Sequence, residues 1–136
     1  MGKQIKVLLA KLGLDVHNRG VLTVAMELRD VGMEVVYIGN ALHEEIVTTA
    51  IQEGVDVVGV SSLGGAHLSL GKQLLKEAER KRIKRDTIFV IGGVFGPADV
   101  EELKKIGFNA VFPPGSTKEN IVRTIKEKLR SVKCFV

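Results

Sequence analysis

Two residues near the start of the chain carry side chains that can bind a metal ion or transfer a proton. Asp15 and His17 stand two positions apart, directly after the first apolar run. The segment that holds them reads Gly13-Leu14-Asp15-Val16-His17-Asn18-Arg19-Gly20. Glycines at both ends permit the tight turns by which a strand gives way to a helix. The pattern Asp-x-His-x-x-Gly at this place indicates a binding or catalytic site.

Several common chemistries of such loops leave signatures that this chain lacks. A dinucleotide needs Gly-x-Gly-x-x-Gly after the first strand, because its pyrophosphate approaches the backbone closely at a helix N-terminus. The Gly-rich phosphate loop that ends in Lys-Ser/Thr and the Ser/Thr-rich turn of flavodoxins are also absent. A phosphorylatable receiver domain needs acidic residues after the first and third strands and a Lys after the fifth. Those places hold Leu9-Ala10, Val60-Ser61 and Phe112-Pro113.

A metal that arrives inside a macrocycle fits the remaining possibilities. One His and one Asp cannot complete a zinc shell, which takes four ligands. They suffice if the metal lacks only an axial ligand, as in haem or a corrinoid. Glycines close several predicted strands at one edge of the sheet, at Gly64-Gly65, Gly92-Gly93 and Gly115, as if the backbone were cleared for something long and polar. Cobalamin has such an appendage in its nucleotide tail, and haem has none.

The elements that must position this loop alternate along the chain. Apolar, β-branched runs predict strands near residues 5–10, 34–38, 56–61, 87–91 and 110–112. Helical periodicity predicts helices near residues 20–31, 43–53, 66–82, 97–106 and 116–130. This alternation predicts an α/β fold, a doubly wound five-stranded parallel sheet in the flavodoxin-like order 2-1-3-4-5. Ligands then lie beyond the carboxyl ends of the strands, between the loops at 11–20 and 61–65.

The same periodicity predicts which helical residues pack against the sheet. The expected core contacts of the first three helices are Val21, Leu22, Ala25, Met26 and Leu28, then Ile46, Val47, Ala50 and Ile51, then Leu68, Leu70, Leu74, Leu75 and Ala78.

Length and composition indicate one globular domain over residues 1–136, with 45% hydrophobic and 26% charged residues. No apolar run approaches the roughly 18 residues of a membrane span, so no membrane contact is expected. The net charge of +4 is mild, and the basic run 80–85 lacks nearby aromatic residues, which favours a solvated helix end over a nucleic-acid site. Cys134 is the single cysteine, which suits the cytoplasm.

The motifs, taken together, resemble a known family. Asp15-x-His17-x-x-Gly20, Ser61-x-Leu63 and Gly92-Gly93 are similar, in order and spacing, to the signature of cobalamin-binding domains that bind the cofactor with its base displaced. The likeness is closest to the cobalamin-binding portion of methylmalonyl-CoA mutase. It extends through Gly92-Gly93-Val94-Phe95-Gly96-Pro97 and Phe112-Pro113-Pro114-Gly115-Ser116.

The resemblance implies a role for each matching residue. His17 would be the lower cobalt ligand in place of dimethylbenzimidazole, Asp15 would orient His17, and Gly20 would let the following helix approach the corrin. The full set of implied cofactor-binding residues is Asp15, Val16, His17, Asn18, Arg19, Gly20, Ser61, Leu63, Gly64, Gly65, Gly92, Gly93, Phe112, Gly115 and Ser116. The family often has Gly at the positions of Val16 and Pro113, Asp at that of Asn18 and Thr at that of Ser116.

The resemblance also implies a division of labour. The chain would be a subunit of an adenosylcobalamin-dependent mutase, an isomerase, with no turnover of its own. An acyl-CoA-binding barrel subunit would carry the substrate site, because such a barrel needs about 250 residues and this sequence has 136. The alternatives are a corrinoid carrier for methyl transfer, a small subunit of another mutase such as glutamate mutase, and a cofactor chaperone or sensor. Carriers usually place a helical cap before this domain, and the start of the chain at a strand favours the mutase. The sequence leaves open the roles of His67, Cys134 and the tail at 132–136.

Overall fold

The computed structural model describes residues 4–12, 19–62, 67–93, 96–113 and 115–132. Within these ranges the strands are β1 (Lys6–Leu12), β2 (Glu34–Ala41), β3 (Val57–Ser62), β4 (Ile88–Gly93) and β5 (Ala110–Phe112). The helices are α1 (Arg19–Asp30), α2 (His43–Glu53), α3 (His67–Arg80), α4 (Pro97–Lys105) and α5 (Lys118–Val132). Every predicted element is present. None of the helices in these ranges is both long enough and apolar enough to cross a lipid bilayer.

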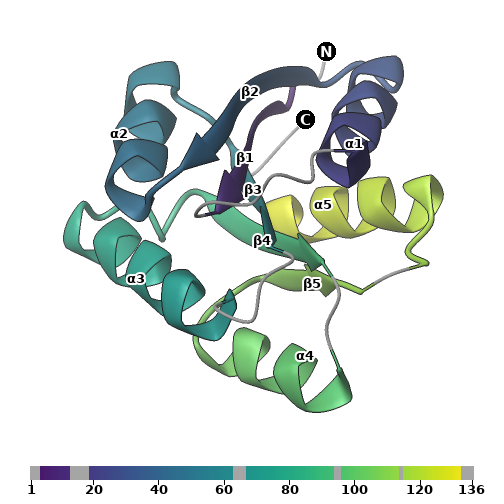
Figure 1. Cartoon of the computed structure of the whole chain (residues 1–136). Helices are drawn as coiled ribbons and strands as arrows, with labels where there is room; N and C mark the ends of the chain where they lie inside the picture. The colour runs from purple at the N-terminus through teal and green to yellow at the C-terminus, as the bar shows by residue number, and fades with distance from the viewer. Residues whose placement is uncertain (1–3, 13–18, 63–66, 94–95, 114, 133–136) are drawn as a thin grey trace.

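The strands form one parallel sheet in the order β2-β1-β3-β4-β5, which confirms the predicted doubly wound topology. Helices α1 and α5 cover one face, and α2, α3 and α4 cover the other (Figure 1). Parallel pairing requires crossovers, and each crossover helix buries one side of the sheet. The carboxyl ends of all five strands therefore meet at one edge, which we call the carboxyl edge.

Side chains alternate between the two faces along each strand, which gives two cores. The core under α2, α3 and α4 contains Leu8, Val58, Phe89 and Ile91, all fully buried. The core under α1 and α5 contains the neighbours of these residues, Val7, Leu9, Val57, Ile88 and Val90. Burial on both faces explains why the strands read as continuous apolar runs and not as alternating patterns.

Four strands extend further toward the carboxyl edge than the sequence predicted, among them β2, which continues to Ala41, and β4, which continues to Gly93. β1 continues through Lys11 and Leu12, which had been expected to begin the loop. β3 includes Ser62. The register explains the extensions, because Lys11 pairs with Ser61 and Asn40, and Ser62 pairs with Gly93. Ladder hydrogen bonds keep these residues in strand conformation although their side chains are poor strand formers.

Three apolar helix residues predicted to be in the core are exposed. Leu22 and Met26 on α1 are 39% and 58% exposed, and Ile51 on α2 is 48% exposed. In α1 the sheet covers only the narrow side that carries the buried Val21, Ala25 and Leu28. In α2 it covers only the side that carries the buried Ile46, Val47 and Ala50. The periodicity of a helix cannot separate residues at the centre of an apolar stripe from residues at its margin.

The basic run 80–85 begins at Arg80, the last residue of α3. Most of its cationic side chains are exposed, as predicted. Lys84 departs from this prediction. Its ammonium donates a hydrogen bond of 2.5 Å to the Gly107 carbonyl oxygen and lies 5.5 Å from the centre of the Phe89 ring. The lysine stem thereby covers the edge of the core under α3 and α4, which is common for amphipathic side chains.

Candidate functional site

The structure describes one part of the predicted cofactor site. Ser61, Gly92, Gly93, Phe112, Gly115 and Ser116 lie within the described ranges, and so does the backbone of Arg19 and Gly20 in the first turn of α1. Asp15, Val16, His17, Asn18, Leu63, Gly64 and Gly65 lie outside them, as does Cys134. The predictions for these residues are therefore not tested. His67 begins α3.

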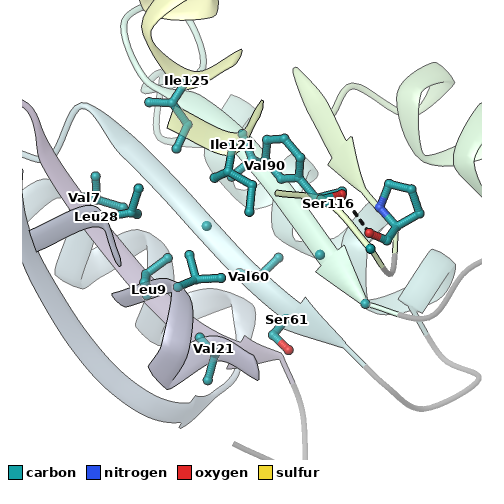
Figure 2. Close-up of a pocket in the computed structure, with 17 residues that line it drawn as sticks. Val7, Leu9, Val21, Leu28, Val60, Ser61, Val90, Ser116, Ile121 and Ile125 are labelled. Carbon is teal, nitrogen blue, oxygen red and sulfur yellow. Dashed lines mark hydrogen bonds between the residues drawn. The ribbon is translucent and has the colours of Figure 1, made fainter. Parts of the chain in front are cut away.

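The six residues from Ser61 to Ser116 named above all line one cavity. It has a volume of about 320 Å³ and lies between the sheet and helices α1 and α5, toward the carboxyl edge (Figure 2). Most of its other lining residues are aliphatic: Val7, Leu9, Val21, Val24, Leu28, Val60, Val90, Ile121 and Ile125. Residues from β3, β4 and the chain from Phe112 onward, far apart in sequence, thus meet at one cavity.

The floor of the cavity consists of small residues in adjacent strands. One row across the sheet is Leu9–Gly59–Val90, and the next row toward the carboxyl edge is Ser61–Gly92–Phe112. Central strands of a buried sheet usually carry large β-branched residues at such positions. Here Ser61 and Gly92 leave the space above them open, and Gly59 lies in the row beside them. Sequence reasoning missed Gly59, although a glycine inside an apolar strand signals close approach of another group.

Gly92 and Gly59 have different reasons for being glycine. A Cβ atom at Gly92 would meet nothing nearer than the Phe112 carbonyl oxygen at 3.7 Å, which is ordinary contact. Packing within the protein therefore does not require this glycine, whereas a ligand in the cavity would. A Cβ atom at Gly59 would come within 2.7 Å of Leu9 Cδ2, so the Leu9 side chain already occupies that space.

The segment after β5 forms a polar rim at the end of the cavity. The Ser116 hydroxyl donates a hydrogen bond of 2.7 Å to the Pro113 carbonyl oxygen. Gly115 has φ of +90°, a conformation that favours glycine. The Thr117 hydroxyl accepts a hydrogen bond of 3.1 Å from the Asn120 amide and so caps the start of α5. These interactions fix the positions of Gly115 and Ser116 beside Phe112.

Lys11 is a further residue that the sequence analysis did not single out. It is only 4% exposed although it is charged, and it pairs with Ser61 of β3 and Asn40 of β2 at the carboxyl edge. Charged lysines are rarely buried to this extent without an interaction. A lysine inside an otherwise apolar strand run is the sequence signal that could have identified it.

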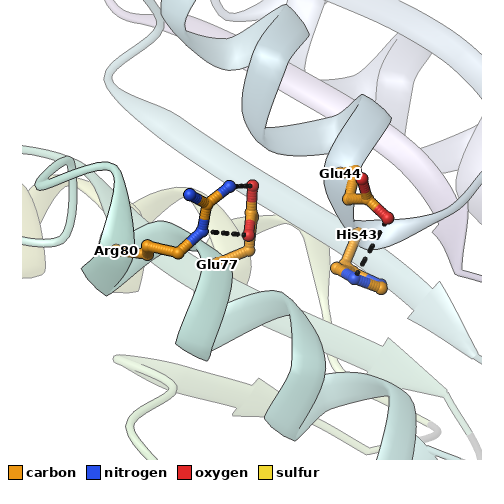
Figure 3. A network of polar contacts seen from close by, with 4 residues as sticks. All are labelled: His43, Glu44, Glu77 and Arg80. Atoms are coloured by element: carbon orange, nitrogen blue, oxygen red, sulfur yellow. Dashed lines mark hydrogen bonds and ion pairs between the residues drawn. The ribbon is translucent and has the colours of Figure 1, made fainter.

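A separate polar network lies on the opposite face of the sheet, on α2 and α3 (Figure 3). Arg80 donates hydrogen bonds of 3.0 and 2.9 Å to the Glu77 carboxylate, which lower the pKa of Glu77. The side chain of His43 is partly exposed, and its Nε2 atom lies 3.8 Å from a carboxylate oxygen of Glu44. In the described part of the chain, no three His, Cys, Asp or Glu side chains gather as a metal site would require.

Comparison with known proteins identifies the class of fold and site. The B12 binding domain family matches residues 5–123. A cobalamin-binding protein from Desulfitobacterium hafniense DCB-2 superposes with a TM-score of 0.80 at 19% identity, over 93% of this chain and 60% of that one, which shows a shared fold. The chain belongs to the B12-binding domain family, as its motifs predicted.

Similar relatives of known name are subunits of CoA mutases. The chain is 44% identical over 123 residues to the 2-hydroxyisobutanoyl-CoA mutase small subunit of Aquincola tertiaricarbonis, covering 90% of each chain. It is 39% identical over 124 residues to the pivalyl-CoA mutase small subunit of Xanthobacter autotrophicus, covering 90% of this chain and 82% of the relative. It is 35% identical over 130 residues to the methylmalonyl-CoA mutase large subunit of Streptomyces virginiae, and there it spans 94% of its own length and 18% of the relative.

Proposed function

We propose that residues 1–136 form the cobalamin-binding small subunit of an adenosylcobalamin-dependent CoA mutase. The observation that carries this proposal is the cavity floor of Ser61 and Gly92, left open toward the carboxyl edge in a chain of the B12-binding family. Full-length similarity to two small subunits of CoA mutases supports the subunit role. A cavity lined by aliphatic side chains with a few hydroxyl groups suits an aromatic base on a polar nucleotide tail.

The cavity would hold the tail of the cofactor with its base displaced from cobalt. Ser61 and Leu63 would contact the base, Gly92 and Gly93 would let the tail pass, and Phe112, Gly115 and Ser116 would lie at its far end. Residues 13–18 connect the end of β1 to the start of α1 in the sequence, and both of these elements contribute residues to the cavity. His17 would bind the lower face of the cobalt there, and Asp15 would accept a hydrogen bond from the other ring nitrogen of His17.

The chemistry would be shared between two chains. Adenosylcobalamin, when bound, supplies an organic radical by homolysis of its cobalt–carbon bond. This chain would hold and orient the cofactor from below and exclude water from the tail. The substrate site would belong to a large barrel subunit that binds the acyl-CoA, so this chain alone would have no mutase activity.

Three acyl-CoA substrates are supported by relatives, pivalyl-CoA among them through the Xanthobacter autotrophicus relative, and the choice would rest with the large subunit. Interconversion of methylmalonyl-CoA and succinyl-CoA is supported by the motif likeness and by the Streptomyces virginiae relative. A 2-hydroxyisobutanoyl-CoA reaction is supported by the relative that is 44% identical over nearly its full length. Assay of the chain with each large subunit in turn, on each of the three substrates, would decide among them.

The cofactor-binding mode can be tested by electron paramagnetic resonance. The purified chain is mixed with adenosylcobalamin, the cobalt is reduced to Co(II), and histidine is labelled with ¹⁵N. We expect hyperfine splitting that follows the label and disappears in His17→Ala, while His43→Ala, on α2 away from the cavity, keeps it. Binding with the cofactor's own base still on cobalt, or a signal that survives His17→Ala, would contradict the proposal.

A further inference from the structure

The two edges of the sheet differ in the surfaces that flank them. We propose that the edge formed by β2 is the docking surface for the large catalytic subunit. We define this β2-edge surface by Leu22 and Met26 of α1, Tyr37 of β2, and Leu42, the residue between β2 and α2. The inference rests on the proposed function, because it names the part of the chain that its partner contacts.

Leu22 and Met26 lie on the side of α1 that faces away from α5. Val24 lines the cavity together with Ile121 and Ile125 of α5, so Val24 marks the side of α1 that faces α5. At 100° per residue, Leu22 and Met26 each lie about 160° around the helix from Val24. Since α1 packs on β1 and β2, their side of the helix is the one nearer the β2 edge. Both side chains are exposed and apolar, although the rest of the helix surface offers polar residues for solvent.

The β2 strand continues this apolar surface across the edge of the sheet. β2 pairs with β1 and is the outermost described strand on its side, and Val35, Val36, Tyr37 and Ile38 are all only partly buried. Leu42 follows β2 at the carboxyl edge and is 57% exposed. An exposed edge strand with apolar flanks is an aggregation liability unless a partner covers it. β2 spans eight residues, long enough for an interface rather than a chance contact.

The opposite edge, formed by β5, has a different character. β5 spans three residues, and a groove of about 410 Å³ runs beside it. The side chains that α4 and α5 contribute to this groove are Lys104, Asn120, Thr124 and Lys128. Charged residues are depleted and large apolar residues enriched at the centres of stable interfaces, so the β5 edge is the poorer docking surface.

The large subunit is the occupant that fits the position of the β2-edge surface. Leu22 lies in the first turn of α1 and Leu42 directly after β2, so both stand at the carboxyl edge, where a bound cofactor would need its exposed face covered. A subunit that covers the cofactor would therefore lie close enough to contact the β2-edge surface as part of the same interface. This chain matches 18% of the methylmalonyl-CoA mutase large subunit of Streptomyces virginiae. In that relative, a similar domain is therefore part of a much larger polypeptide.

The test measures binding of the large catalytic subunit from the same organism to the cobalamin-loaded chain by isothermal titration calorimetry. The test variant is Leu22→Gln with Met26→Gln, two exposed positions where polar residues should not disturb folding. The matched control is Lys104→Gln with Lys128→Gln at the β5 edge. We expect the test variant to bind the large subunit at least tenfold more weakly and the control to bind within twofold of the wild type. Each variant alone should keep the cobalamin absorbance spectrum of the wild type.

Each other outcome overturns the inference in a recognisable way. Equal binding by the test variant, or a loss confined to the control, would exclude the β2 edge as the docking surface while leaving the proposed function intact. A wild-type chain that forms dimers by sedimentation, and a test variant that is monomeric, would mean that a second copy covers this surface. A cobalamin-loaded wild-type chain that does not bind the large subunit would contradict the proposed function itself.

Discussion

The two faces of the sheet are built from the same strands and differ in how completely they are filled. On the face under α2, α3 and α4, the central positions carry Leu8, Val58, Phe89 and Ile91, which are fully buried. On the face under α1 and α5, the neighbouring positions toward the carboxyl edge carry Gly59, Ser61 and Gly92, and a cavity of about 320 Å³ remains. The difference lies in side-chain size and not in the backbone, which both faces share.

The cavity does not extend over the whole face of the sheet under α1 and α5. Near the amino ends of the strands, Val57 and Ile88 are fully buried against Ile125 and Leu129 of α5. Close packing there stabilises the α1 and α5 layer, since folded interiors are normally as dense as organic crystals. Val57 and Ile88 do not line the cavity, although Val7, which pairs with Val57, does. The glycines and the serine of its floor lie toward the carboxyl edge, where a ligand can enter. Comparison of the faces separates residues kept for stability from residues kept for binding.

Substitution of two adjacent leucines of β1 should give the largest change in the free energy of unfolding. Leu8 faces the filled side and Leu9 lines the cavity. We expect Leu8→Ala to reduce the free energy of unfolding by about 3–5 kcal/mol, and Leu9→Ala by about 2–3 kcal/mol, because Leu9 already has empty space beside it and loses fewer contacts. Urea denaturation followed by circular dichroism measures both. Equal losses would mean that the cavity closes in solution.

A glycine on the filled side gives the next test. A Cβ atom at Gly71 of α3 would lie 2.9 Å from Cε2 of the buried Phe108 ring. Gly71→Ala should therefore destabilise the protein by about 1 kcal/mol, although alanine in a helix would otherwise gain about that amount. Thermal unfolding measures the change. A rise in the unfolding midpoint would show that the Phe108 ring has room to move.

Gly92 on the hollow side should behave in the opposite way. Gly92→Ala adds a methyl group that meets only ordinary contacts, so its effect on the free energy of unfolding should stay within about 0.5 kcal/mol. Affinity for cobalamin, measured by absorbance titration, should fall at least tenfold under the proposed function. A variant that binds cobalamin as the wild type does would place the cofactor tail elsewhere.

Lys84 at the margin of the filled side gives the smallest test. Burial lowers the pKa of Lys84, so between that lowered pKa and 10.5 the unfolded chain binds more protons than the folded one. Stability should therefore rise slightly as the pH increases through this window. Lys84→Met should abolish this part of the rise, which urea midpoints at several alkaline pH values would reveal. A rise of the same size in the variant would assign it to another group.

The sequence by itself determined the order of the elements, the parallel topology and the edge at which the motifs meet. Strand and helix periods are local, and right-handed crossovers leave few ways to connect five strands and five helices. The sequence therefore predicts that Ser61, Gly92, Phe112 and Ser116 lie around one crevice. The family followed from the spacing of the same motifs.

Only the tertiary structure decided which side chains fill space and which leave it empty. Gly59 and Gly92 look alike in sequence, yet the first accommodates the Leu9 side chain and the second faces an open cavity. Leu22 and Met26 share the apolar pattern of Val21 and Ala25, yet the sheet covers only the latter pair. Both distinctions depend on contacts between residues distant in sequence. A periodic pattern records that a side chain is apolar, and only the packed fold determines what lies against it.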